Sequence, residues 1–180
     1  MTLRSEYDCW HHRIHQADPV HDDSTSPWYQ LVRQYLGNLA GFRVLEIACG
    51  RGGFTAELAA RGAQVVGCDF SASALHAAKE KANTKGIPSV VFSQADAQQL
   101  PFPDSCFDLI LSCETIEHVP DVSAALREMH RVLKPNGRLL FVEHGLAPEP
   151  RVRWWQDHFT PLWKRCSGGC HLNRPIADII

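Results

Sequence analysis

Residues 44–53, VLEIACGRGG, decide the fold of this chain. The first four are three aliphatic residues around Glu46, a pattern typical of a short strand buried on both faces. A glycine-rich turn follows at once, and an apolar segment then runs to Arg61-Gly62, a pair that ends helices well. A buried strand, a glycine loop and a helix in this order indicate the ligand-binding turn of an α/β domain.

The same alternation continues toward residue 147. Short apolar runs predict further strands, and amphipathic stretches predict helices; the strands are expected at 65–69, 90–92, 107–112 and 139–142, and the helices at 6–16, 28–39, 71–86 and 121–133. Apolar strands that alternate with helices predict an α/β domain with a doubly wound, mostly parallel sheet. We divide this single domain into an N-terminal helical lid or cap (1–40), a cofactor-binding core (41–147) and an acceptor-pocket segment (148–180).

Composition excludes several other classes of protein. Eighteen Lys and Arg residues against 20 Asp and Glu residues give the 180-residue chain a formal charge of −2, so neither nucleic acid nor an anionic membrane is an expected partner. No run approaches the roughly 18 apolar residues of a membrane span. The first thirty residues carry no apolar stretch like that of a signal peptide. The seven cysteines are scattered, several of them within apolar runs, which predicts a reduced, cytoplasmic protein.

The residues around the glycine loop discriminate between two classes of cofactor. Asp69 lies 19 residues after Gly50, at the end of a predicted strand, where a carboxylate accepts hydrogen bonds from ribose hydroxyls. A dinucleotide site needs a third glycine where this chain has Thr55. Glu46, just before the loop, would repel a pyrophosphate but suits a cationic ligand. S-adenosylmethionine carries an ammonium and a sulfonium, so charge favours S-adenosylmethionine over a nicotinamide dinucleotide.

Five blocks between about residues 40 and 145 carry a resemblance to a known family. In chain order they read VLEIACGRGG, CDFS, ADAQQLPFPD, FDLILS and LKPNGRL. They resemble class I S-adenosylmethionine-dependent methyltransferases of the small-molecule, type 11-like kind. The resemblance implies the Rossmann-like class I methyltransferase fold, S-adenosylmethionine as cofactor and a small-molecule acceptor.

The resemblance also implies the roles of particular residues. Glu46 would lie near the methionine amine, Gly50 and Gly52 would line the methionine and ribose, and Asp69 would bind the ribose. The adenine would be met by Phe70, Asp96 and Ala97, and the methionine end by Cys113. Ala48, in the same loop, replaces a glycine that is often found there, and we expect binding to tolerate this change.

A second group of polar residues follows the fourth predicted strand, where Glu114, Glu117 and His118 would share one face of a helical turn. The E-x-x-E-H pattern is similar to that of ubiquinone-type O-methyltransferases and small-RNA terminal methyltransferases, where it supports a metal. Three roles stay open for these residues. His118 could be a catalytic base, assisted by Glu117 and by Glu143 after the fifth strand. The three residues could instead bind a divalent ion such as Mg²⁺, which we do not expect, or could merely cap the turn.

The segment after residue 147 is rich in tryptophan. We expect Trp154, Trp155, Phe159 and Trp163 either to form an apolar wall of the acceptor pocket or to pack in the core. The segment with Cys166, Cys170 and His171 lacks the paired short cysteine spacings of zinc sites, so no zinc is expected there. The final antiparallel strand pair of the class I fold is expected to be missing. A truncated chain, or a homo-oligomer in which a second copy covers the exposed sheet edge, would account for this.

Together these features predict an enzyme that transfers a methyl group from S-adenosylmethionine to an O, N or S atom of a small, lipophilic or aromatic acceptor. Two alternatives stay open: a truncated or non-catalytic module that only binds the cofactor, and a nucleotide-dependent oxidoreductase.

Overall fold

A computed structural model describes residues 3–17, 25–87 and 90–179 of the chain. Its strands are β1 (Arg43–Ile47), β2 (Gln64–Asp69), β3 (Val90–Gln94), β4 (Phe107–Cys113) and β5 (Leu133–Val142). Its helices are α1 (Leu3–Ala17), α2 (Pro27–Leu36), α3 (Gly53–Ala60), α4 (Ala72–Thr84), α5 (Val122–Val132), α6 (Pro150–Cys166) and α7 (Ile176–Ile179).

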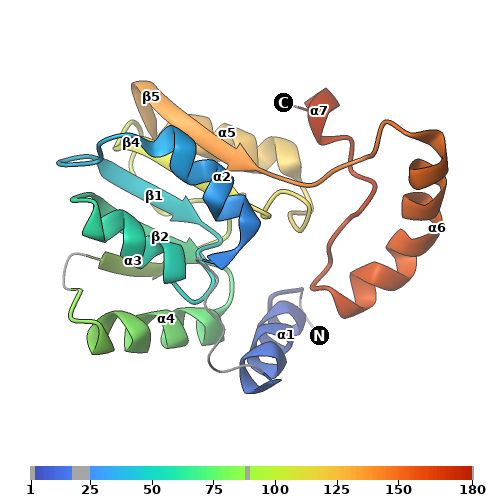
Figure 1. Ribbon diagram of the computed structural model, residues 1–180, viewed down its shortest axis with the longest axis horizontal. Coiled ribbons are helices and arrows are strands. Elements are labelled where there is room, and N and C mark those ends of the chain that lie inside the picture. The colour runs from blue at the N-terminus through green and yellow to red at the C-terminus, as the bar shows by residue number, and fades with distance from the viewer. Residues whose placement is uncertain (1–2, 18–24, 88–89, 180) are drawn as a thin grey trace.

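The strands form one parallel sheet in the order β3-β2-β1-β4-β5. The chain therefore starts in the middle of the sheet, builds outward to β3 and then crosses back to β4 (Figure 1). The reversal lies between β1 and β4, which is the place where doubly wound sheets bind their ligands. The predicted doubly wound parallel α/β fold is confirmed.

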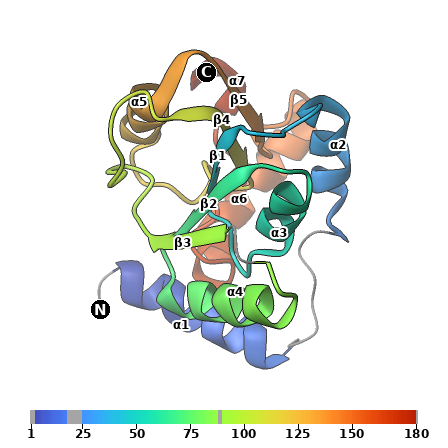
Figure 2. The same ribbon diagram turned by 90° about the vertical axis from the view of Figure 1, so that its left-hand side faces the viewer.

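Helices cover both faces of this sheet. On one face α2 and α3 pack a buried cluster that includes Leu36, Phe54 and Leu58 against β1, β2 and β4. On the other face α5 packs Ala125 and Met129 against the opposite side of the same strands. Figure 2 shows the sheet nearly edge-on, with α5 on one side and α3 on the other. This double cover explains why the strands are apolar runs rather than alternating ones.

The helix expected at 28–39 covers Pro27–Leu36, and the largest difference from the predicted boundaries lies at the start of β5. The helix expected to continue to Leu133 ends at Val132, and β5 begins at once instead of at residue 139. Phe107 pairs with Leu133 across a register shift, and Asn136 has a left-handed backbone with φ 66°. Pro135 cannot donate to a ladder. The turn-like residues 134–137 therefore lie within an irregular stretch of the strand.

The chain after β5 leaves the body of the molecule and then returns. Helix α6 extends away from the sheet, and the loop after it runs back to the sheet edge before α7 (Figure 1). The Arg174 guanidinium holds the returning loop by donating to the carbonyl oxygens of Ile116 and Val119, at 2.5 Å each. Between β5 and residue 179 the structure contains no further strand. Among the described helices, none combines the length and the apolar character needed to cross a membrane.

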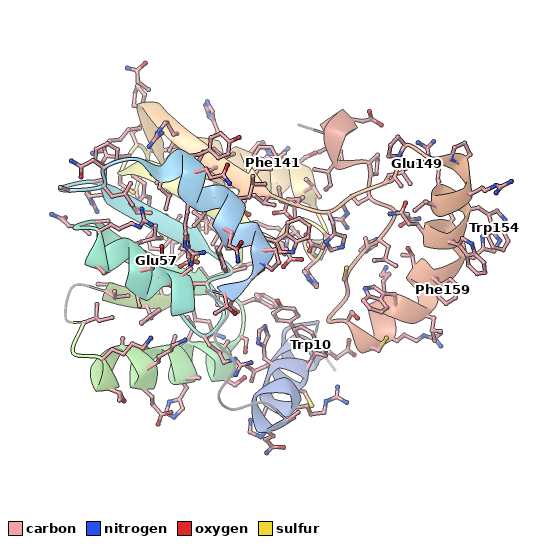
Figure 3. All side chains as sticks on the ribbon, in the orientation of Figure 1. Trp10, Glu57, Phe141, Glu149, Trp154 and Phe159 are labelled. Carbon is pink, nitrogen blue, oxygen red and sulfur yellow. The ribbon has the colours of Figure 1, made fainter. Side chains whose placement is uncertain are left out.

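The tryptophan-rich helix differs from the expectation of an apolar pocket wall or a packed core. The side chains of Trp154, Trp155, Phe159 and Trp163 are 43–55% exposed. Figure 3 shows Trp154 on the outer side of α6, pointing away from the sheet. None of the four residues lines either pocket described below. What faces inward is Gln156, whose side-chain amide bonds the backbone of Gly145, Ala147 and Leu172.

Candidate active site at the carboxyl edge of the sheet

The loop between β1 and α3 has a backbone that ordinary residues rarely adopt. Ala48, Gly50 and Gly52 all have positive φ values, of 55°, 52° and 69°. A Cβ atom on Gly52 would also stand 2.9 Å from the Phe92 ring. Ala48 lies in the left-handed region without being glycine, which costs about 1 kcal/mol. The loop thus brings bare backbone to the ends of the strands.

Asp69 fixes this loop from the end of β2. Its Oδ2 accepts a hydrogen bond from the Gly50 N–H at 2.9 Å, and its Oδ1 accepts one from the Ser71 N–H at 2.8 Å. The side chain is buried. Burial raises the pKa of Asp69, while His11 and the backbone donors lower it. The sequence separation of Gly50 and Asp69 therefore ends in a direct contact at the edge of the sheet.

A small pocket of about 70 Å³ opens beside Asp69 and lies under α1. Its walls are the ends of β1, β2 and β3, the turn after β4 and one residue of the loop after α6; the lining includes Ala48, Asp69, Phe70, Asp96, Ala97, Gln98, Thr115, His118 and Gly168. The Asp96 carboxylate accepts from both the backbone and the side-chain N–H of Gln98, at 2.9 and 3.0 Å. None of the described residues that line this pocket is Lys or Arg.

Helix α1 covers the pocket with Tyr7, whose ring lies 6.2 Å from Phe70 and 5.9 Å from the His118 ring, centroid to centroid. Burial, together with the charges of Asp69 and Glu117, raises the pKa of Tyr7, so its hydroxyl stays protonated. Both views place α1 beside α4 (Figures 1 and 2).

Hydrogen bonds hold helix α1 to the start of α4 and to the end of α6. The Asp8 carboxylate accepts from the Ser71 hydroxyl at 2.6 Å and from the Ser73 N–H at 2.9 Å, at the start of α4. The Trp10 indole donates to the Cys166 carbonyl oxygen at 2.9 Å, at the end of α6. Helix α1 therefore spans the pocket from the core to the outer segment.

A larger pocket of about 560 Å³ adjoins the first on the side of α2. Ala48 lines both pockets, so they meet at the glycine loop. Aromatic side chains from α1 and α2 form part of the wall of the second pocket; its lining includes Trp10, His11, Trp28, Tyr29, Gly50, Arg51, Cys113 and Glu114. Burial, with Glu46 and other nearby carboxylates, raises the pKa of Cys113, so this thiol stays protonated.

Glu46 lies behind the loop rather than in either pocket. Its buried carboxylate accepts hydrogen bonds from the hydroxyls of Thr55 and Tyr29. Thr55, which interrupts the dinucleotide fingerprint, thus binds the residue that would repel a pyrophosphate. Tyr29 also lines the second pocket, so the hydrogen bond from its hydroxyl connects Glu46 to the wall of that pocket.

The turn after β4 is not the helical turn that would align three ligating residues. Glu114 has φ 50°, and the chain then makes short i to i+3 hydrogen bonds from His118 to Thr115 and from Val119 to Ile116. Glu114 is thereby separated from His118 and lies 3.8 Å from His144 Nδ1.

The partly buried Glu143 and the buried Glu117 lie around this turn. Glu143 accepts hydrogen bonds from the N–H groups of Thr115 and Ile116 and from the Ser112 hydroxyl. Glu117 is 1% exposed, and its Oε2 has no hydrogen-bond partner among the residues that the structure describes. Burial and the neighbouring Glu143 raise the pKa of Glu117 to about 8. Glu143 therefore positions the turn, and neither carboxylate lines a pocket.

The predicted site residues thus fall into three groups. Ala48, Asp69, Phe70, Asp96, Ala97 and His118 line the first pocket, and Gly50, Cys113 and Glu114 line the second. Glu46, Gly52, Glu117 and Glu143 support the site from behind. Sequence reasoning missed Gly168, which lines the first pocket, and Asp8, which holds α1 over that pocket by bonding Ser71 and Ser73. No local motif marks either residue.

Residues 45–141 match a family described as a methyltransferase domain. The chain is 40% identical over 120 residues to the ubiquinone/menaquinone biosynthesis C-methyltransferase UbiE of Pectobacterium carotovorum subsp. carotovorum (strain PC1). That match covers 64% of this chain and 48% of the relative. The chain therefore spans about half the length of the curated relatives it matches.

Solved structures share the fold. The crystal structure of the YcgJ protein from Bacillus subtilis aligns with a TM-score of 0.72 and 32% identity, over 83% of this chain and 63% of that one. An S-adenosylmethionine-dependent methyltransferase from Mesorhizobium loti aligns with a TM-score of 0.62 and 27% identity, over 68% of this chain and 56% of that one.

Proposed function

Because this chain belongs to the class I S-adenosylmethionine-dependent methyltransferases, we propose that it binds S-adenosylmethionine under α1 and transfers the methyl group to a small aromatic acceptor. The observation that carries the proposal is the hydrogen bond from the Gly50 N–H to Asp69, which joins the glycine loop to the pocket that Asp69 lines. A pyrophosphate binds best beside cations, or at a helix N-terminus that has no acidic side chain nearby. The buried Glu46 carboxylate behind the loop therefore disfavours the nucleotide-dependent oxidoreductase, although Arg51 of the same loop lines the second pocket.

The chemistry of the donor set fits S-adenosylmethionine. Asp69 and Asp96 place carboxylate acceptors at the ends of β2 and β3, suited to the hydroxyl donors of a ribose and the amino donor of an adenine. Phe70 and Ala97 supply apolar surface between these two acids. When bound, S-adenosylmethionine supplies a methyl group on a sulfonium, which is already an activated leaving group.

The chain's own contribution is mainly alignment, because the leaving group needs no further activation. Tyr7 and α1 would exclude water from the cofactor side of the site. Trp28 and Tyr29 would orient a flat, apolar acceptor in the second pocket. The protonated Cys113 thiol would be a poor competitor for the methyl group.

The acceptor atom is a finer proposal. The residues alone predict O, N or S as the acceptor, whereas the name of the UbiE relative describes methylation of carbon in quinone biosynthesis. An electron-rich ring such as a hydroquinone offers both oxygen and carbon in the flat, apolar shape that the aromatic lining fits. The role of His118 as a base stays a prediction, tested by the rate of His118→Ala between pH 6 and 8.

The test is a methyl-labelling screen. The full chain is incubated with methyl-labelled S-adenosylmethionine and separate sets of hydroquinones, phenols, amines and thiols, and the products are mapped to the methylated atom. We expect labelled product from the aromatic set, and at least a tenfold loss of kcat/KM for the acceptor in Trp28→Ala.

Trp154→Ala is the matched control, because Trp154 is exposed on α6 and lines neither pocket. It should label acceptors at the unaltered rate. Absence of labelled product in every set would refute the proposed activity. Equal losses in Trp28→Ala and Trp154→Ala would refute the placement of the acceptor.

A further inference from the structure

Three side chains with different ligating atoms meet at the side of the first pocket. Glu117 and His118 come from the turn after β4, and Cys170 comes from the loop after α6. The carboxylate oxygen, the imidazole nitrogen and the sulfur all lie within 4.8 Å of one another. We propose that Glu117, His118 and Cys170 form a binding site for a divalent transition metal of the zinc class, with a coordination position left open.

The ring orientation of His118 suits this role. Its Nδ1 lies 2.9 Å from the carbonyl oxygen of Gly168, which can only accept, so Nδ1 carries the hydrogen. In the neutral ring Nε2 is then the unprotonated nitrogen, and it lies 3.8 Å from Glu117 Oε1. A histidine that donates one ring N–H to a backbone carbonyl and points the other nitrogen at the ion is the usual arrangement of a metal ligand.

The buried Glu117 carboxylate needs a cation or a proton beside each of its oxygens. Its Oε1 lies 3.2 Å from His144 Nδ1 and 3.8 Å from His118 Nε2. Its Oε2 is buried and has no hydrogen-bond partner in the described part of the chain. Burying such an acceptor is costly unless a cation or a proton satisfies it. Glu143 is the neighbouring carboxylate, and two carboxylates side by side are satisfied by a shared proton or by a bound cation, which a metal ion on Glu117 would supply.

The spacing and the type of these ligands select the metal. Oxygen, nitrogen and sulfur ligands about 2.0–2.3 Å from a tetrahedral Zn²⁺ stand about 3.3–3.8 Å from one another. The 3.8 Å between His118 and Glu117 already meets this spacing, and Cys170 is close enough to reach it by a small side-chain shift. A thiolate selects Zn²⁺ over Mg²⁺, which prefers an all-oxygen shell.

His144 supports the site from outside. Its Nε2 lies 3.2 Å from Cys170 Sγ, and its Nδ1 lies 3.2 Å from Glu117 Oε1. It thus contacts two of the proposed ligands at once. A competing set of Glu114, Glu117 and His144 also lies within 4.8 Å. We favour the set with Cys170 because Cys170 is 4% exposed, whereas the Glu114 side chain is 43% exposed and has water as an alternative partner.

Such an ion would fasten the outer segment to the core. The loop that carries Cys170 also carries Gly168, which lines the first pocket, and it contacts the turn through hydrogen bonds of His118, His171 and Arg174. A metal bound by Cys170 and Glu117 would join residues that are 53 positions apart in the chain. This inference does not depend on methyl transfer, because a metal that only fixes the loop would satisfy it.

The test uses Co²⁺ as a spectroscopic substitute for Zn²⁺ on the chelator-treated full chain. We expect one ion per chain, visible bands of a low-symmetry site, and a near-ultraviolet sulfur-to-metal charge-transfer band, all displaced by Zn²⁺. Cys170→Ser should lose the charge-transfer band. His118→Ala should weaken Zn²⁺ binding at least tenfold in competition with a chelator dye.

Two control variants separate this site from its neighbours. Cys166→Ser removes an exposed thiol four residues away, and Glu114→Gln removes a ligand of the competing set. Both should keep the charge-transfer band and the affinity. Melting curves of the metal-free variants verify that Cys170→Ser is folded. The proposal is wrong if the wild-type chain binds no Co²⁺, if the band survives in Cys170→Ser, or if Glu114→Gln abolishes binding while Cys170→Ser retains it.

Discussion

Removing the Asp8 carboxylate should release α1 from the pocket. The Ser71 hydroxyl and the Ser73 N–H both donate to the same Asp8 oxygen, at 2.6 and 2.9 Å. A hydrogen bond to a charged group contributes about 1.5–3 kcal/mol, and access of water to the half-buried Asp8 reduces this gain. We therefore expect Asp8→Ala to weaken the docking of α1 by about 2 kcal/mol, which raises the fraction of undocked α1 about 30-fold.

Hydrogen exchange measured by mass spectrometry reports this fraction directly. Amides of α1 should exchange about 30-fold faster in Asp8→Ala, while peptides from α5, on the far face of the sheet, should be unaffected. Glu6→Ala is the matched control, because Glu6 lies on the same helix with an exposed side chain. Equal exchange of α1 in Asp8→Ala and Glu6→Ala would refute the role of Asp8 as the tether.

Three further outcomes follow from the same contacts. Gly52→Ala should lower the free energy of unfolding by about 3 kcal/mol in urea titrations, because it adds a left-handed alanine and a collision with Phe92. Gly86→Ala, with φ 64° and open space around the added Cβ, should cost only about 1 kcal/mol, and equal costs would contradict the collision. Glu143→Ala leaves two backbone N–H groups unpaired and should lower the free energy of unfolding by about 2–4 kcal/mol. Glu143→Gln should lower it less. A melting temperature that is unchanged in both variants would contradict the role of Glu143 in the turn. Hydrogen bonds from Ser71 and Ser73 lower the pKa of Asp8 below 3.8, so its tethering is fully present above about pH 4 and is lost as pH falls through the lowered pKa. Protection factors of α1 should therefore be constant from pH 8 to 5 and fall below pH 4, and a fall between pH 8 and 5 would refute this assignment.

Local signals in the sequence were enough for the central part of the fold. Ser71 and Asp121, at the starts of two predicted helices, cap α4 and α5, because a hydroxyl or carboxylate before a helix pairs with a free N–H group. The contact of Asp69 with the Gly50 N–H could be anticipated from the strand-loop-helix order, since parallel strands end at one edge.

The remaining features depend on contacts that no local pattern encodes. Glu114 has a left-handed backbone, which turns the chain after β4 so that its N–H groups donate to the Glu143 carboxylate. This turn breaks the helical alignment that the E-x-x-E-H spacing suggested. Cys170 meets Glu117 and His118 only because Arg174 fastens the returning loop to the turn. The aromatic residues of α6 could not be placed, because their spacing is the same for a packed helix and for an exposed one.

The most direct test of the central claim is titration calorimetry of the full chain with S-adenosylhomocysteine, repeated with NADH and with Asp69→Asn. One molecule of S-adenosylhomocysteine should bind per chain, NADH should not bind, and Asp69→Asn should weaken binding about tenfold or more through loss of a charged acceptor. Asp108→Asn, at the opposite end of the sheet, should bind like the unaltered chain. Binding of NADH but not of S-adenosylhomocysteine, or binding that Asp69→Asn leaves unchanged, would contradict the account.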